Sequence, residues 1–166
     1  MGYKRNKDPN FWNEEHVNCN CGSFALNVTS WVTPYDNDEY YTDEYRLEFI
    51  DELLNEGYNR HEIMHELLDL DSQSLLSNFL WLEPISLEEA LPTDRVVAYR
   101  IHLDEGSLID GEIDDDFHFR VRINGFWFEK CGCCGVQFCG TEADEKPWHT
   151  ARYLNYDSEI RYFRFR

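Results

Sequence analysis

The sequence has little basic charge and no long apolar run, and each shortage excludes a class of protein. Its 166 residues hold 15 Lys and Arg against 33 Asp and Glu, which gives a formal net charge of −18. A field of that sign repels phosphate backbones, so we expect no direct binding to nucleic acid. No apolar stretch approaches the length of a membrane span, so we expect no membrane partner either.

The opening residues also lack the apolar segment of a secretory signal, because Met1–Asn10 is polar. We therefore expect a cytoplasmic protein, whose thiols stay reduced. Six cysteines in that setting indicate catalysis or metal binding before they indicate disulfides. The chain carries neither a phosphate-binding glycine loop, nor a dinucleotide fingerprint, nor a serine elbow, so none of those chemistries is predicted.

The residues that are present predict one packed domain over 1–166. Apolar residues make up 42% of the chain and aromatic residues 16%, which is ample for a core. Helical patterns fill the first half, over 21–30, 44–55, 59–70 and 74–82. Strand patterns follow over 95–103, 117–123, 126–130 and 159–166, with 131–140 read as a loop. We predict an α+β domain with the helices packed on a C-terminal antiparallel sheet.

A hairpin turn at Asn124-Gly125 predicts which side chains meet on that sheet. Asn-Gly between two β-rich runs is the strongest short-range hairpin signal. A two-residue turn there places Arg120 opposite Glu129. His118 and Glu129 then lie on one face of adjacent strands, one diagonal step apart, where long side chains can touch.

Cys21 is the candidate nucleophile. It stands where the short helix of 21–30 begins, and the amides and dipole of a helix N-terminus favour a thiolate. A thiol nucleophile needs a base from elsewhere in the fold, and His118 on a predicted strand suits that role. Glu129 is the candidate to orient His118. The Asn20 side chain and the Cys21 amide are the candidate oxyanion donors.

Two segments resemble a known family. Asn20–Asn27 (NCGSFALN) resembles the Asn-Cys-x-x-x-Ala-Leu-Asn nucleophile segment of small papain-like hydrolases related to the NlpC/P60 group, which occur in bacteria and phages. Asp116–Phe119 (DFHF), followed by Trp127-x-x-Lys130-x-Gly132, resembles their histidine hairpin. The resemblance implies a papain-like fold and a cysteine hydrolase that cleaves an amide, isopeptide or ester bond of a peptide or amide-containing substrate, with no required cofactor. The chain departs from the family at Glu129, where members tend to carry histidine.

A cysteine-rich segment supports a different interpretation, a zinc site. Four thiols within nine residues form the pattern C-x-C-C-x4-C, made by Cys131, Cys133, Cys134 and Cys139. Zinc takes four tetrahedral sulfur or nitrogen ligands, so these four thiols are candidate ligands of a structural zinc. In a variant of this site, Cys19 and Cys21 would join Cys131 and Cys133, and Cys21 would then be a ligand instead of a nucleophile.

The segment His61–His65 (HEIMH) matches the zinc-protease motif literally. Asn59 as an N-cap with Glu62 at the third helical position forms a capping box, which already explains the glutamate. The helical wheel places both histidines beside the solvent flank of the apolar stripe. We therefore interpret the segment as a solvated amphipathic helix.

The net charge supports a function of another class. A small, acidic protein, such as one encoded by a phage, can act as a non-enzymatic inhibitor that covers a basic surface of a host protein. Such a protein needs no catalytic pair.

Overall fold

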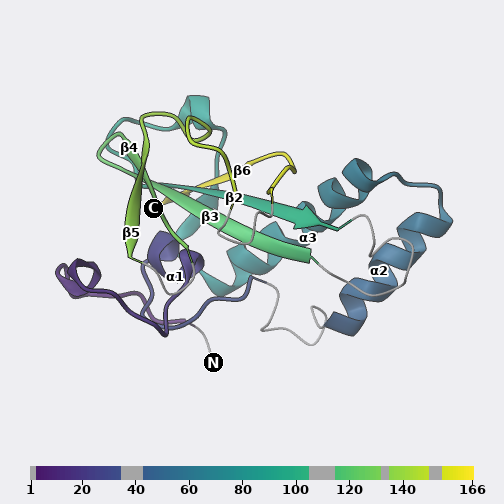
Figure 1. Ribbon diagram of the computed structural model, residues 1–166, viewed down its shortest axis with the longest axis horizontal. Coiled ribbons are helices and arrows are strands. Elements are labelled where there is room, and N and C mark those ends of the chain that lie inside the picture. The colour runs from purple at the N-terminus through teal and green to yellow at the C-terminus, as the bar shows by residue number, and fades with distance from the viewer. Residues whose placement is uncertain (1–2, 35–42, 105–114, 132–134, 150–154) are drawn as a thin grey trace.

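The computed structural model describes residues 3–34, 43–104, 115–131, 135–149 and 155–166. Within these residues the protein is α+β, with three α-helices and one six-stranded antiparallel sheet (Figure 1). The helices are α1 (Cys21–Leu26), α2 (Asp43–Asn55) and α3 (Arg60–Asn78). The strands are β1 (Leu82–Pro84), β2 (Val96–Leu103), β3 (Asp115–Ile123), β4 (Phe126–Lys130), β5 (Val136–Gly140) and β6 (Arg161–Phe165). Short 3₁₀ turns cover Phe11–Asn13 and Leu87–Glu89.

The sheet has the order β1-β6-β2-β3-β4-β5, and every pairing is antiparallel. Because side chains alternate along a strand, the sheet presents two different faces. Tyr99 and Phe119 lie on the face that α1 and α3 cover, in the larger core cluster. Ala98 and Trp127 lie in a second cluster with Trp148, which comes from the segment between β5 and β6. The predicted arrangement of helices packed on an antiparallel sheet is confirmed at this level.

Helix α3 begins as the sequence predicts. Asn59 is its N-cap, its side chain accepts from the Glu62 amide, and Glu62 reaches back to the Asn59 amide. Both histidines of the zinc-protease motif, His61 and His65, are exposed, whereas the residues between them, Ile63 and Met64, are buried. The structure therefore places both histidines of the motif on the solvated side of α3, with the apolar residues between them facing the core.

The helix boundary expected near residue 70 is wrong. Helix α3 continues to Asn78, so the segment expected as a separate helix over 74–82 is its last turn followed by β1. Asp71, just past the expected boundary, is fully buried. Its carboxylate accepts from Arg46 of α2 at 2.5 Å and from the Tyr99 hydroxyl at 2.7 Å, so this polar side chain is satisfied inside the core and the helix continues past it.

The loop expected over 131–140 is also corrected. Its second half forms β5, which pairs Lys130 with Val136 and Phe128 with Phe138. Gly140 ends the strand at a φ of +112°, which glycine adopts without strain. Strand β5 is an edge of the sheet. Phe138 on β5 and Phe126 at the start of β4 are both exposed.

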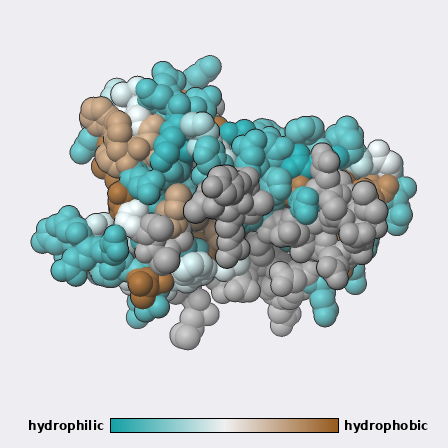
Figure 2. Space-filling view, viewed as in Figure 1, coloured by the Kyte–Doolittle hydropathy of each residue, from teal (hydrophilic) through white to brown (hydrophobic). Residues whose placement is uncertain are grey.

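Figure 2 shows hydrophobic colour gathered over β4 and β5 on a largely teal face. No helix in the described parts of the chain has the length and apolar character needed to cross a membrane.

Candidate functional site

Helix α1 is short, and the surrounding residues fix both of its ends. At its start Asn20 and Ser23 form a reciprocal capping box. At its end Asn27 takes the left-handed conformation, with φ at 57°. The Arg95 guanidinium donates to the carbonyls of Phe24 and Ala25, which satisfies the last turn. All six residues of α1 are buried, so tertiary packing and not helix propensity holds it in place.

The N-terminus of α1 lies where β3 and β4 separate. The two strands pair only near their turn, from Val121–Ile123 to Phe126–Phe128. Beyond that point α1 contacts both strands. The Lys130 ammonium donates to the Cys19 carbonyl at 2.6 Å, and the main chain of Phe119 hydrogen-bonds the Cys21 thiol. Cys21 therefore sits beside the residue that follows His118.

Gly22 allows this close approach. A Cβ at position 22 would lie 3.0 Å from Val32 Cβ and 3.1 Å from Phe119 Cε2. Both neighbours are fully buried, so neither has room to move away.

We expect Gly22→Ala to destabilise the protein by about 1–3 kcal/mol, because the added methyl overpacks the contact between α1 and β3. Urea unfolding measures the difference. The matched control is Gly135→Ala, whose methyl has the flexible Glu15 side chain as its nearest described neighbour, at 3.2 Å, and should change stability by less than about 0.5 kcal/mol. Equal stability of the two variants would contradict the close contact.

His118 and Glu129 form a buried pair. His118 Nε2 lies 2.8 Å from Glu129 Oε2, and the two side chains are only 2% and 1% exposed. The Tyr156 ring stacks on the imidazole with centroids 5.2 Å apart, and Trp148 meets its edge. The predicted contact between His118 and Glu129 is confirmed, and the hairpin register that predicted it is the observed one.

Basic side chains surround the Glu129 carboxylate. Arg120 Nε donates to Oε2 at 2.9 Å, and Lys146 Nζ donates to Oε1 at 3.1 Å. Burial alone would raise the pKa of Glu129, but its contacts with His118 and Arg120 hold it at about 2. Glu129 is therefore an anion at neutral pH and holds one nitrogen of His118 in a fixed direction.

Arg120 organises this region. Its guanidinium is fully buried and donates to the carbonyls of Ala143, Lys146 and Pro147 as well as to Glu129. The guanidinium carbon also lies 4.4 Å from the centre of the Trp148 ring. The pairing of Arg120 opposite Glu129 follows from the hairpin register, but its contacts with the 143–147 segment leave no pattern in the sequence.

Cys21 starts α1, as the sequence predicts, but its thiol is not activated in this conformation. Burial raises the pKa of Cys21 to about 12, and the main-chain hydrogen bond from Phe119 offsets only part of that effect. The dipole of so short a helix does not reverse the cost of burying a thiolate. No hydrogen bond joins Cys21 to His118 within the described residues.

The Asn20 side chain is used within the fold. Its Oδ1 accepts from Ser23 and from the Val32 amide, and its Nδ2 donates to the Val32 carbonyl at 2.7 Å. These bonds tie the start of α1 to the segment that follows it. They account for the asparagine as a structural cap and leave the Cys21 amide as the oxyanion donor to consider.

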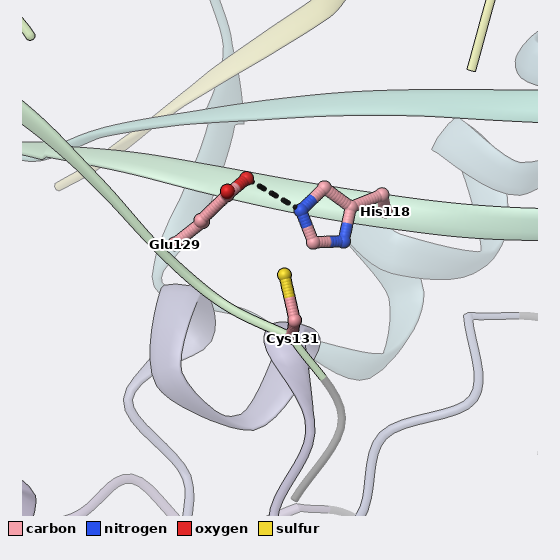
Figure 3. A group of neighbouring side chains, drawn as sticks. All are labelled: His118, Glu129 and Cys131. Carbon is pink, nitrogen blue, oxygen red and sulfur yellow. Dashed lines mark hydrogen bonds and ion pairs between the residues drawn. The ribbon is translucent and has the colours of Figure 1, made fainter. Parts of the chain in front are cut away.

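The cysteine-rich segment is described only in part, because Cys133 and Cys134 lie outside the described residues. Cys139 is buried on β5. Cys131 follows β4 and points toward the His118 and Glu129 side chains (Figure 3). Candidate ligand atoms of these three residues all lie within 4.8 Å of one another. When the hairpin register is extended past its last observed pair, Val121 with Phe128, it sets Cys131 opposite His118. The sequence therefore contained a signal for this neighbour.

No family model, curated protein or solved structure matches this chain. The resemblance to papain-like hydrolases therefore rests on the two sequence segments, and the arguments about function rest on the geometry described above.

Proposed function

We propose that the protein is a cysteine hydrolase in which Cys21 attacks an amide, isopeptide or ester carbonyl and His118 carries the proton. Glu129 orients the imidazole. The observation that carries the proposal is the buried hydrogen bond between His118 and Glu129. The residue after His118 on β3 is Phe119, whose main chain bonds the Cys21 thiol. A nucleophile, a base and a group that holds the base are the three parts that thiol hydrolysis needs.

In this proposal, the contact of Glu129 with His118 Nε2 determines which ring nitrogen carries the proton. It leaves Nδ1 as the nitrogen that accepts the thiol proton and later returns it to the leaving group. Since the Glu129 carboxylate stays ionised, it stabilises the imidazolium that forms during attack. Water then hydrolyses the acyl thioester, with His118 again acting as the base.

The resting site holds a neutral thiol in this proposal. A pKa near 12 for Cys21 means that the thiolate forms as sulfur attacks, instead of existing beforehand as an ion pair with His118. The Cys21 amide is the proposed oxyanion donor, because the Asn20 amide group is bonded to Val32.

A papain-like arrangement is part of the proposal. It is supported by the order of the parts, with the cysteine at the start of a buried helix and the histidine on a later antiparallel strand against which that helix packs. A peptide or other amide-containing molecule is the substrate class that this chemistry implies. No cofactor takes part in the proposed steps.

The test uses an activated ester, p-nitrophenyl acetate, which needs no knowledge of the natural substrate. We expect a burst of p-nitrophenol and an acetyl group on Cys21, located by peptide mass spectrometry. Cys21→Ala should lower the rate by at least about 10³-fold, as removal of a catalytic nucleophile does. Cys139→Ser is the matched control, because it also removes a buried thiol but lies on β5. Acetylation of another cysteine, or full activity in Cys21→Ala, would reject Cys21 as the nucleophile.

The net charge of −18 favours one other function, binding to a basic protein without catalysis. That function predicts an affinity that falls steeply with salt and is unchanged by Cys21→Ala. The hydrolase proposal instead predicts that Cys21→Ala loses p-nitrophenyl acetate hydrolysis. The same variant therefore separates the two functions.

A further inference from the structure

We propose that His118, Glu129 and Cys131 together bind one Zn²⁺ ion, and that the bound metal switches the proposed hydrolase off. The binding half of this inference stands on geometry alone. The inhibitory half rests on the proposed function.

The three side chains converge on one space. His118 comes from β3, Glu129 from β4 and Cys131 from the residue that follows β4, and Figure 3 shows all three directed at the same point. A ring nitrogen, a carboxylate oxygen and the Cys131 sulfur all lie within 4.8 Å of one another. His118 and Glu129 are almost fully buried, and Cys131 is partly exposed, which gives an ion a way in.

Each member of this ligand set is of a type that zinc binds in proteins. Zinc binds imidazole nitrogen, thiolate sulfur and carboxylate oxygen in tetrahedral geometry, and three protein ligands leave the fourth position to water. Bond lengths of about 2.0–2.3 Å keep tetrahedral ligand atoms roughly 3.3–3.8 Å apart. The 2.8 Å contact between His118 and Glu129 therefore has to widen by only a fraction of an ångström, while Cys131 moves inward.

The basic neighbours of Glu129 are compatible with a metal. Ligating carboxylates are usually held by outer hydrogen bonds, and Arg120 supplies one from a fixed, buried position. Lys146 also contacts Glu129, but its side chain is 42% exposed and can turn to solvent. On binding, the Cys131 thiol releases its proton to solvent and the sulfur–zinc bond forms. The thiolate and the Glu129 carboxylate then balance the two charges of the ion.

A zinc ion on His118 removes the base from the proposed reaction. Cys21 would then keep its proton, and hydrolysis would stop until the metal leaves. This site differs from the one that the cysteine spacing predicts. It takes Cys131 from that pattern, but it completes the set with the histidine and the glutamate of the hairpin instead of with Cys139.

The binding test is a titration of the metal-free protein with Co²⁺ under anaerobic conditions. We expect one Co²⁺ per chain, with a near-ultraviolet thiolate-to-cobalt band that an equivalent of Zn²⁺ displaces. Cys131→Ser should abolish the band and weaken binding by at least about 100-fold, and Glu129→Gln should weaken it without removing the sulfur signal. Cys139→Ser should keep the band. A band that survives in Cys131→Ser, or that is lost equally in Cys139→Ser, would overturn the assignment.

The inhibition test follows the p-nitrophenyl acetate burst in the same preparations. We expect Zn²⁺ to suppress the burst and a chelator to restore it. A normal cobalt band without any burst in the metal-free protein would reject the hydrolase and leave the metal site standing. A normal burst without a cobalt band would do the reverse. Zinc that binds but leaves the burst unchanged would overturn the inhibitory half.

Discussion

Replacing Arg120 by alanine is expected to lower the free energy of unfolding by about 4 kcal/mol or more. The change leaves the Glu129 carboxylate buried without its closest guanidinium and removes the donor to the carbonyls of Ala143, Lys146 and Pro147. It also removes the cation that stacks on Trp148. Urea unfolding followed by tryptophan fluorescence measures the loss. The transition should move to much lower urea, since the total stability of such a domain is only about 5–15 kcal/mol.

Arg122→Ala is the matched control for Arg120. Arg122 lies two residues along β3 on the same face, and its guanidinium donates to the Leu91 carbonyl at 2.7 Å in an exposed position. Its loss should cost less than about 1 kcal/mol. If the two variants unfolded at the same urea concentration, Arg120 would not be the residue that holds Glu129 and the 143–147 segment together.

Asp71→Ala should cost about 3–5 kcal/mol, the usual effect of removing one member of a buried ion pair. Asp71 joins three elements, because it accepts from Arg46 of α2 and from Tyr99 of β2 while it belongs to α3. Arg46 is 1% exposed, so the variant leaves a buried cation without this carboxylate. Thermal unfolding followed by circular dichroism gives the magnitude.

Two further variants test whether the effect of Asp71→Ala comes from the burial of its ion pair. Asp69→Ala removes an ion pair with Arg161 in which the aspartate side chain is 44% exposed, so it should cost less than about 1 kcal/mol. The double variant Arg46→Met with Asp71→Leu removes both buried charges and should recover most of the loss of Asp71→Ala. A double variant as unstable as the single one would show that the damage comes from packing and not from an unsatisfied charge.

The part of the fold that the sequence predicts is the part with strong local signals. Asn124-Gly125 takes the positive φ values of a tight turn, and its two-residue length determines the register that brings Glu129 to His118. The capping box of Asn59 and Glu62 marks the start of α3. Cys21 begins α1 because Asn20 caps it through Ser23. Each of these features depends on residues at most a few positions apart.

The features that the sequence does not predict depend on contacts between residues far apart in the chain. The continuation of α3 past residue 70 depends on Asp71, whose buried carboxylate is satisfied by Arg46 and Tyr99 from other elements. Strand β5 is short and lies in a segment rich in glycine and cysteine, and only its pairing with β4 makes it a strand. The raised pKa of Cys21 follows from burial under β3, whereas the sequence shows only its place at a helix start. The roles of Cys21, His118 and Glu129 in catalysis remain predictions that the experiments above test.

The burial of thiols also sets an alkaline limit to the stability of the fold. Burial raises the pKa of Cys21 and of Cys139 to about 12, whereas a thiol in the unfolded chain titrates near 9.0. The folded protein therefore binds these protons more tightly than the unfolded chain does. Their contribution to stability is complete below pH 9 and is lost as the pH rises toward 12. We therefore expect Cys21 to become exposed to solvent at high pH only when the protein unfolds. A thiol reagent added at that pH would report on unfolding instead of on catalysis.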